Sequence, residues 1–315
     1  MATLTDVAKK ANVSKMTVSR VINHPEQVTD ELKELVYAAM EELDYHPNIA
    51  AKALVTNRSQ IIKLYILEEL DTTEPYYMNL LMGIAKAVGK AHYSLQLVTK
   101  DGVDRGACDG YILTGFRQED FDWIRGLKKP VVLFGENDQN IDFVDSDNHY
   151  GTAIATKYAL EAGYQQVIFI GIDVNEPFET AREAGYQEVM TAAGLPAQIY
   201  HLPNRSTKSE HFIAQYWENL NQNTCFVCSS DRLALGVERG LQSCGADIPQ
   251  DFGIIGFDGV FLDQVSSPKL TTMKQPIIEM GEACGEMLVK KIEDNGATQG
   301  YHRFLPELIV RESTR

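Results

Sequence analysis

Basic, hydroxyl and thioether side chains are concentrated in one short segment near the N-terminus, KMTVSRVIN (15–23). Its apolar residues Val18, Val21 and Ile22 follow the i, i+3, i+4 spacing of a helix that buries one face. The side chains between them are Lys15, Met16, Thr17, Ser19 and Arg20. Such short polar and basic groups suit the base edges and phosphates of DNA. The pattern favours a DNA-reading helix, with a small helical interaction module as the alternative.

Catalytic and metal-binding chemistry finds little support in the rest of the chain. We find no nucleophile elbow, no phosphate-binding loop and no pair of acids with a plausible partner, so we expect neither an enzyme nor a cofactor. The CxxC motif from Cys225 to Cys228 lies in the apolar run TCFVC, which is typical of a buried strand. Scattered cysteines and the absence of an apolar leader in MATLTDVAKK indicate reduced thiols and a cytoplasmic protein.

Charge is distributed unevenly along the 315 residues. The net charge is −15, but residues 1–60 carry seven basic and eight acidic side chains, a net of −1. Residues 61–315 carry 22 basic and 36 acidic side chains, a net of −14. An acidic body repels DNA, so a DNA-binding face must be local to the N-terminus. The sequence has no apolar run of about eighteen residues, so no membrane span is expected.

Three helices are predicted to hold the basic segment in place. We expect Thr5 to cap the first helix, Asn12 to make a left-handed turn, and Ser14 to cap the helix with the basic face. Thr29 is expected to cap a third helix. The apolar stripe of that helix consists of Leu32, Leu35, Val36, Ala39, Met40 and Leu43. This order of elements is a helix-turn-helix arrangement, which we assign to residues 1–46.

A hinge is predicted at residues 47–60. Pro47 ends the third helical region, because the residue before a proline avoids the α conformation. Asn48 can cap a short helix, IAAKAL (49–54), which has too few residues to be stable alone in water. Order in this segment must therefore come from a partner.

From residue 61 the sequence changes to short apolar strands that alternate with helices. Strands are predicted at 61–67, 93–98, 110–115, 131–135, 167–171, 225–229 and 252–257. Helices are predicted at 75–91, 150–162, 179–193, 209–219, 232–243 and 277–293. The pattern is that of an α/β fold in which two parallel sheets are covered by helices. Residues 61–315 should form a core of two subdomains, with ligands at the carboxyl ends of the strands.

The first fifty residues closely resemble the headpiece of the LacI/GalR repressor family. The matching residues are Asp6-Val7-Ala8, Val13-Ser14, Thr17-Val18-Ser19-Arg20-Val21-Ile22-Asn23, Leu43, Tyr45 and Pro47-Asn48. The resemblance implies that Lys15, Met16 and Arg20 read the bases of a double-stranded DNA operator. It also implies that Thr17, Ser19 and Asn23 contact phosphates. The same DNA-binding surface then includes Thr5 and Ser14.

The resemblance extends to the hinge. In this family, two hinge helices of a dimer pair over the minor groove, and each wedges a leucine between base steps. Leu54 matches that leucine, Ala51 is small enough for a close helix approach, and Asn48 begins the helix. Lys52 stands where arginine is usual, which makes its phosphate contact weaker or less directional.

The core resembles the effector-binding core of the same family, which shares its architecture with periplasmic sugar-binding proteins. The implied effector-binding residues are Tyr76, Tyr77, Asp147, Arg182, Ser230, Asp258 and Gln275. Carboxylates accept from sugar hydroxyls, a guanidinium donates to sugar oxygens, and aromatic rings cover apolar sugar faces. A surface ion pair remains the alternative for Arg182, and a strand-end cap for Asp258. Glu176 replaces a basic residue of the purine-sensing branch, so a sugar is favoured over a purine.

The sequence departs from the pattern of the LacI/GalR family in two places, and in both it is shorter. Residues 99–109, TKDGVDRGACD, replace what is usually a full helix and hold no more than about two turns. We therefore expect that crossover helix to be lost or rudimentary. No leucine heptads follow the core at the C-terminus, so a homodimer is expected rather than a tetramer.

These features together predict a dimeric repressor of carbohydrate-utilisation genes that leaves a near-palindromic operator when a sugar binds. A regulator of the same family that needs a co-repressor or a partner protein is the first alternative. A sugar transport-binding protein is the alternative from another class, but it should carry a leader and lack the headpiece.

Overall fold

The computed structural model describes residues 2–23, 25–45, 58–68, 75–100, 102, 104 and 106–315. Two compact units make up the chain, Met1–Gln60 and Ile61–Arg315, and each is described separately below. The predicted hinge residues Asn48, Ala51, Lys52 and Leu54 lie outside the described residues.

The first unit is the predicted set of three helices around a small apolar core. Its buried side chains include Val7, Val18, Val21, Val36 and Ala39. Asn12 adopts a φ of +52° in the turn between the first two helices, as predicted. The elements are α1 (Leu4–Lys10), α2 (Lys15–Asn23), the 3-10 turn η1 (Pro25–Gln27) and α3 (Asp30–Glu42).

Helix caps differ from the prediction at one end. Thr3, not Thr5, is the N-cap of α1, because the Asp6 carboxylate accepts from both the Thr3 N–H at 2.9 Å and the Thr3 hydroxyl at 2.6 Å. Ser14 caps α2 as predicted, since its Oγ accepts from the Thr17 N–H at 3.0 Å. Leu35 was wrongly placed in the apolar stripe of α3, because it is 54% exposed.

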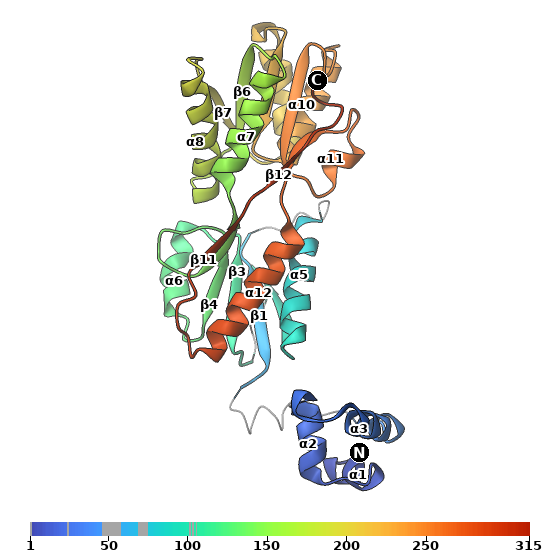
Figure 1. Cartoon of the computed structure of the whole chain (residues 1–315). Coiled ribbons are helices and arrows are strands. Elements are labelled where there is room, and N and C mark those ends of the chain that lie inside the picture. The colour runs from blue at the N-terminus through green and yellow to red at the C-terminus, as the bar shows by residue number, and fades with distance from the viewer. Residues whose placement is uncertain are drawn as a thin grey trace. The chain divides into compact units, whose positions relative to one another are not determined.

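The second unit contains two six-stranded sheets, one in each lobe (Figure 1). All neighbours are parallel except β10 and β12, which are antiparallel. The first sheet, in spatial order, is β11 (Tyr301–Phe304), β5 (Phe143–Ser146), β4 (Val131–Phe134), β3 (Gly110–Thr114), β1 (Ile61–Ile66) and β2 (Ser94–Thr99). The second is β12 (Glu307–Ile309), β10 (Thr271–Lys274), β9 (Phe252–Asp258), β8 (Thr224–Cys228), β6 (Gln166–Ile172) and β7 (Gln198–Leu202).

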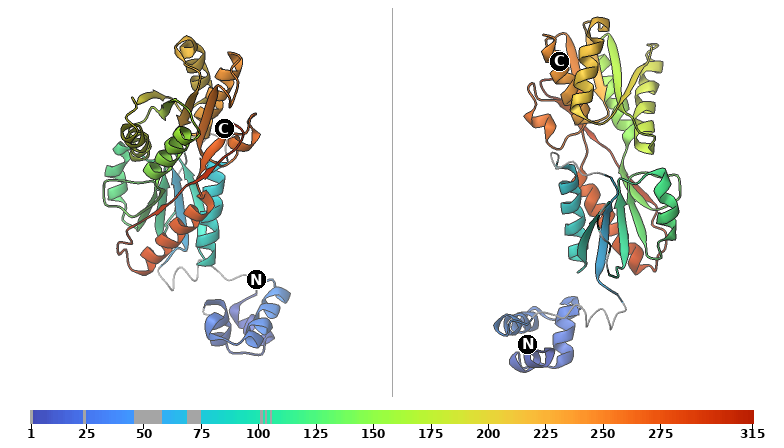
Figure 2. Two further views of the ribbon diagram at one scale, coloured as in Figure 1. Left: turned by 45° about the horizontal axis from the view of Figure 1, so that its top comes forward. Right: turned by 180° about the vertical axis from the view of Figure 1, so that it is seen from behind.

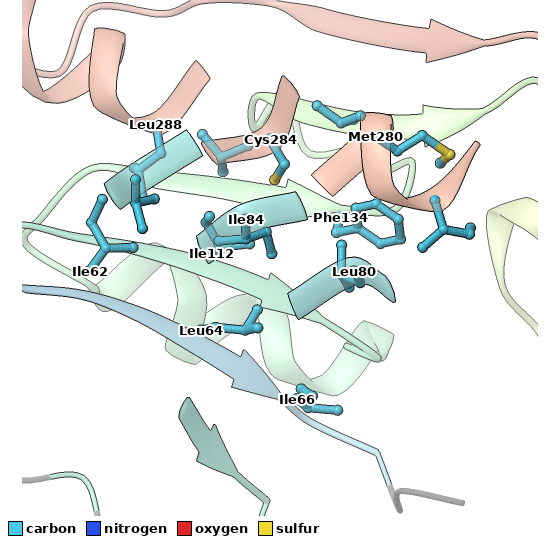
Figure 3. Packing of buried hydrophobic residues seen from close by; sticks show 14 of the residues in the cluster. Ile62, Leu64, Ile66, Leu80, Ile84, Ile112, Phe134, Met280, Cys284 and Leu288 are labelled. Carbon is cyan, nitrogen blue, oxygen red and sulfur yellow. The ribbon is translucent and has the colours of Figure 1, made fainter. Parts of the chain in front are cut away.

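Helices cover both sheets. Helices α5 and α12 pack on one face of the first sheet, where Ile84, Cys284 and Leu288 meet Ile62 and Ile112 (Figure 3). Helices α7 and α8 cover one face of the second sheet, and α9 and α10 cover the other. The helices are α5 (Tyr76–Lys90), α6 (Phe121–Gly126), α7 (Asn148–Glu161), α8 (Pro177–Ala192), α9 (Ser206–Tyr216), α10 (Asp231–Ser243), α11 (Leu262–Val265) and α12 (Ile277–Glu293).

The chain passes between the lobes three times, from β5 to α7, from β10 to α12 and from β11 to β12 (Figure 2). All seven predicted strands and all six predicted core helices are present, with ends shifted by up to three residues. Sequence reasoning missed the short elements β5, β7, β10, β11, β12, α6 and α11.

Two further predictions are confirmed. The residues between β2 and β3 that the structure describes form no helix, so the crossover there is shortened as expected. Cys225 and Cys228 are both buried in β8 and lie in the clusters on opposite faces of the second sheet. Burial raises the pKa of both thiols, as expected for structural cysteines.

Within the described parts of the chain, no helix is long and apolar enough to cross a membrane.

Candidate functional site

The predicted DNA-reading side chains lie on the outer face of α2. Lys15, Met16 and Arg20 are exposed, and Met16 is an unusual apolar group to leave 68% exposed. Thr17 and Ser19 are half-buried at the edge of this face. A free apolar side chain between two cations suits contact with base edges better than contact with water.

The remaining predicted headpiece contacts are less uniform. The hydroxyls of Ser14 and Thr17 lie 2.9 Å apart at the start of α2, beside backbone N–H groups that can face a phosphate. Thr5 is half-buried in the first turn of α1. The side chain of Asn23 lies outside the described part of the chain.

The core contains a cleft of about 490 Å³ between its two lobes. Every lining residue lies at or beyond the carboxyl end of a parallel strand, or in the helix that follows it, which is where α/β sheets bind ligands. The first lobe contributes Glu68, Tyr76, Tyr77, Thr114, Gly115, Phe116, Arg117, Phe134, Gly135, Glu136 and Asp145. The second contributes Ile172, Asp173, Val174, Glu176, Pro177, Phe178, Arg182, Pro203, Asn204, Ser230, Arg232, Asp258 and Gln275.

Arg182 is fixed in place by the second lobe. Its Nε donates to Asn148 Oδ1 at 2.8 Å, and its Nη1 donates to the Ser229 carbonyl. The guanidinium carbon lies 3.7 Å from the centre of the Phe257 ring. Arg182 is only 6% exposed, so the surface ion-pair alternative is wrong. The side chain presents a rigid positive group whose remaining N–H donors can serve a ligand oxygen.

Two carboxylates face this cleft from opposite lobes. Asp258 accepts from Gln275 Nε2 at 2.8 Å, and its φ of +121° is strained for a residue with a side chain. Asp145 accepts from the Glu136 and Ser146 N–H groups, each at 2.7 Å. Burial raises the pKa of Asp145 to about 6, despite these hydrogen bonds and the nearby Arg182. Both groups can accept hydrogen bonds from ligand hydroxyls.

Aromatic rings make up much of the apolar lining. Tyr76 and Tyr77 meet edge to face, with ring centres 5.4 Å apart, at the start of α5. The Tyr77 hydroxyl donates to Glu68. Burial, with Asp258 and Asp145 nearby, raises the pKa of Tyr76. Flat rings beside carboxylates can cover the C–H face of a sugar while its hydroxyls are hydrogen-bonded.

Arg117 connects carboxylates of the two lobes. Its Nη2 lies 2.9 Å from Glu68 Oε2 in the first lobe. Its Nε lies 3.7 Å from Glu176 Oε1, at the start of α8 in the second lobe. Burial is the main cause that raises the pKa of Glu176, and the Arg117 charge opposes it.

Most of the predicted effector residues meet in one place. The cleft lining includes Tyr76, Tyr77, Arg182, Ser230, Asp258 and Gln275. Ser230 also caps α10 by accepting from the Leu233 N–H at 3.1 Å. Asp147 does not line the cleft. It caps α7 by accepting from the Tyr150 N–H at 2.9 Å, and Asp145 lines the cleft instead.

Several lining residues were not predicted. They include Glu68, Arg117, Glu136, Asp173 and Asn204, and each lies one to three residues beyond the end of a strand. Four of those strands were predicted, so reading the first polar residues beyond each strand would have found them. Asn204 follows β7, which sequence reasoning missed.

Comparison with known proteins gives two family matches. Residues 3–48 match "Bacterial regulatory proteins, lacI family", and residues 156–314 match "Periplasmic binding protein-like domain". The HTH-type transcriptional regulator YvdE of Bacillus subtilis (strain 168) is 56% identical over 315 residues, which is all of both chains.

Solved structures show the same fold at low identity. The lac repressor dimer bound to operator and the anti-inducer ONPF matches with a TM-score of 0.77, at 22% identity over 99% of each chain. The transcriptional regulator CelR–cellobiose complex matches with a TM-score of 0.72, at 24% identity over 99% of this chain and 100% of that one. The family matches of the headpiece and of the core agree with the full-length relative, so the chain belongs to the lacI family of bacterial regulatory proteins.

Proposed function

We propose that this chain is a homodimeric, sequence-specific repressor of carbohydrate-utilisation genes that is released from its operator by a sugar. The observation that carries the proposal is a cleft with carboxylates and aromatic rings in the same chain as an exposed basic reading helix. DNA would be bound by residues 1–46 together with the hinge at 47–60. The effector would be bound by the core, residues 61–315. Because its operator would be on the chromosome, the protein would act in the cytoplasm.

A sugar is the effector class that the cleft supports best. Asp145 and Asp258 can each accept from neighbouring hydroxyls, and Arg182 can donate to a ring or hydroxyl oxygen. The volume of about 490 Å³ equals that of about sixteen water molecules at roughly 30 Å³ each, which leaves room for more than one sugar ring. CelR, which has the same fold, was solved with the disaccharide cellobiose.

Coupling to DNA would follow from closure of the cleft. Lining residues come from both lobes, so a ligand that contacts both favours the closed arrangement by its differential affinity. Closure would shift the first lobe, whose strand β1 begins directly after the hinge, and the two hinge helices of the dimer would separate.

The dimer would form through apolar side chains that the described chain leaves exposed on one side of the core. They are Met78 and Met82 on α5, Ile278 on α12, and Phe261 and Val265 at α11. Figures 1 and 2 show α5 and α11 on the same side of the core. Methionine and aromatic side chains are enriched in the centres of protein interfaces. Met82→Glu should therefore convert the dimer to a monomer in light scattering.

The test begins with selection of binding sites from random double-stranded DNA by the full-length protein. Fluorescence anisotropy then measures affinity for the selected site with maltose, cellobiose, ribose or hypoxanthine added. We expect one sugar to release the DNA, and Asp258→Ala to abolish release while leaving DNA binding intact. Asp247→Ala, at an exposed acid outside the cleft lining, is the matched control.

The outcomes separate the alternatives. Tighter DNA binding with a small molecule would favour the co-repressor form of regulation. Selection of no site, with sugar binding retained, would favour a transport-binding role. A normal sugar response in Asp258→Ala would place the effector site elsewhere.

A further inference from the structure

The cleft between the lobes carries an excess of negative charge. Six lining residues are acidic and three are arginines. The acids come from both lobes and are Glu68, Glu136, Asp145, Asp173, Glu176 and Asp258. We propose that the cleft accepts only uncharged saccharides and rejects phosphorylated or carboxylated ones. This inference rests on the proposed sugar-sensing function, and names the chemical class of the effector.

The three arginines are already engaged by the protein. Arg182 is held by Asn148 and the Ser229 carbonyl. Arg117 lies between Glu68 and Glu176, two carboxylates for one positive charge. A ligand anion at Arg117 would have to displace one of these carboxylates and leave it uncompensated.

Arg232 also contacts the protein, but through a neutral acceptor. It donates to the Asn204 carbonyl at 3.4 Å and has a further interaction within the chain. Arg117 is thus paired with carboxylates, and the charge of Arg182 already opposes the rise in pKa of the buried acids Asp145 and Glu179. The three arginines therefore do not offset the six acids of the cleft.

Two helix N-termini at the cleft are also poor anion sites. Helix α8 starts with Pro177, which has no N–H, and its N-cap is the acid Glu176. Helix α10 starts with Asp231, and the Ser230 hydroxyl already accepts from the Leu233 N–H. Helix N-termini commonly bind phosphate because they carry a partial positive charge and unpaired N–H groups. At α8 and α10 these positions are occupied by acidic side chains, a proline and an N–H that is already capped.

The hydrogen-bond donors and acceptors of the cleft also favour an uncharged saccharide over a phosphorylated one. Ionised carboxylates only accept, as do the oxygens of a phosphate dianion, so neither can satisfy the other. Sugar hydroxyls donate and therefore suit Asp145 and Asp258, whereas both oxygens of Glu136 already accept from Arg303. Asp145 already has a pKa raised by burial and by Glu136, and another anion nearby would add to that repulsion.

The first experiment compares matched ligand pairs by isothermal titration of the full-length protein. Maltose, cellobiose and trehalose are each titrated beside their 6-phosphate esters. We expect the sugar that binds to do so at least about tenfold more tightly than its ester, a ratio that corresponds to roughly 1.4 kcal/mol. An ester that binds as tightly as its parent sugar, or more tightly, overturns the proposal.

The second experiment needs no sugar. Pyrophosphate is titrated into the wild type, into Glu68→Gln/Glu176→Gln and into the same double variant with Arg117→Gln. We expect no binding by the wild type, binding by the double variant because Arg117 is released, and loss of that binding in the triple variant. Glu279→Gln/Glu282→Gln, on α12 outside the cleft lining, changes the net charge equally and should bind nothing.

The outcomes distinguish this inference from the proposed function. Wild-type binding of pyrophosphate that Arg117→Gln abolishes would overturn the inference, whatever the sugars do. If no sugar and no ester binds, the sugar-sensing function is refuted. The pyrophosphate series would still test whether the cleft rejects anions. Unchanged thermal unfolding midpoints of the variants verify that each is folded.

Discussion

Ionisation of Asp145 should reduce the stability of the core as the pH rises from about 4 to 7. The carboxyl group is buried at the end of β5, and burial raises its pKa from 3.8 to about 6 in the folded protein. Because the folded state holds the proton more tightly than the unfolded chain does, the stabilising contribution is present at low pH. It is lost as the pH rises through the folded pKa.

The magnitude follows from the two pKa values. At about 1.36 kcal/mol for each pH unit, the gap between 3.8 and about 6 corresponds to about 3 kcal/mol of unfolding free energy. About 2 kcal/mol of this should be lost between about pH 4 and pH 7. Asp145→Asn cannot ionise and keeps one acceptor for the Glu136 and Ser146 N–H groups. The variant leaves one of these two N–H groups without an acceptor, and the resulting loss of stability is the same at every pH.

The assay is urea unfolding of wild type and Asp145→Asn at one protein concentration, followed by tryptophan fluorescence. Trp123 and Trp217 both lie in the core, so the signal reports its unfolding. The variant should gain about 2 kcal/mol relative to the wild type from pH 4 to pH 7. Glu282→Gln should change in the opposite direction, because the hydrogen bond and charge of Lys86 lower the pKa of Glu282. A difference between Asp145→Asn and wild type that is constant with pH refutes the reasoning.

Two other perturbations test the headpiece and the shortened crossover. Lys15→Ala and Arg20→Ala should each weaken operator binding by about 1–3 kcal/mol while binding to random DNA falls less, and equal losses in fluorescence anisotropy would contradict base reading. Asp104→Ala should lower the unfolding free energy of the core by about 3 kcal/mol in urea, because it leaves buried Lys63 without its carboxylate. Adding Lys63→Met should restore most of that loss, and no recovery would show that Asp104 acts through something else.

The headpiece and the long core elements could be predicted because their apolar spacing is regular. Helix α2 begins and ends at the predicted residues, and Asn12 makes the predicted left-handed turn. The missed strands are three to five residues long, too short to show a period, and β11 (YHRF) is mostly exposed. Such strands form because a neighbouring strand in the finished sheet supplies hydrogen bonds, which the local sequence does not record.

The cleft was located correctly from the sequence, but of its six acidic residues only Asp258 was predicted to bind the effector. Asp147 matched a family pattern, yet the start of α7 uses its carboxylate as a cap. Asp145 sits inside the strand FVDS, where a buried acid argues against a strand on hydrophobicity alone. The position is tolerated because two backbone N–H groups satisfy its oxygens, and that arrangement depends on the distant residue Glu136.

The shortened crossover and the buried Lys63 explain each other. Lys63 lies in β1, in a run that reads as an apolar strand, and its side chain is 1% exposed. A full crossover helix with an apolar face would leave this ammonium group without partners, at a cost of several kcal/mol. The short segment instead brings the Asp104 carboxylate and the Gly106 carbonyl to Lys63 Nζ. Asp104 also accepts from the Tyr65 hydroxyl, so one carboxylate satisfies two polar groups of the same strand. The loss of the helix is therefore compatible with a folded first lobe only because β1 presents polar side chains on this face of the sheet.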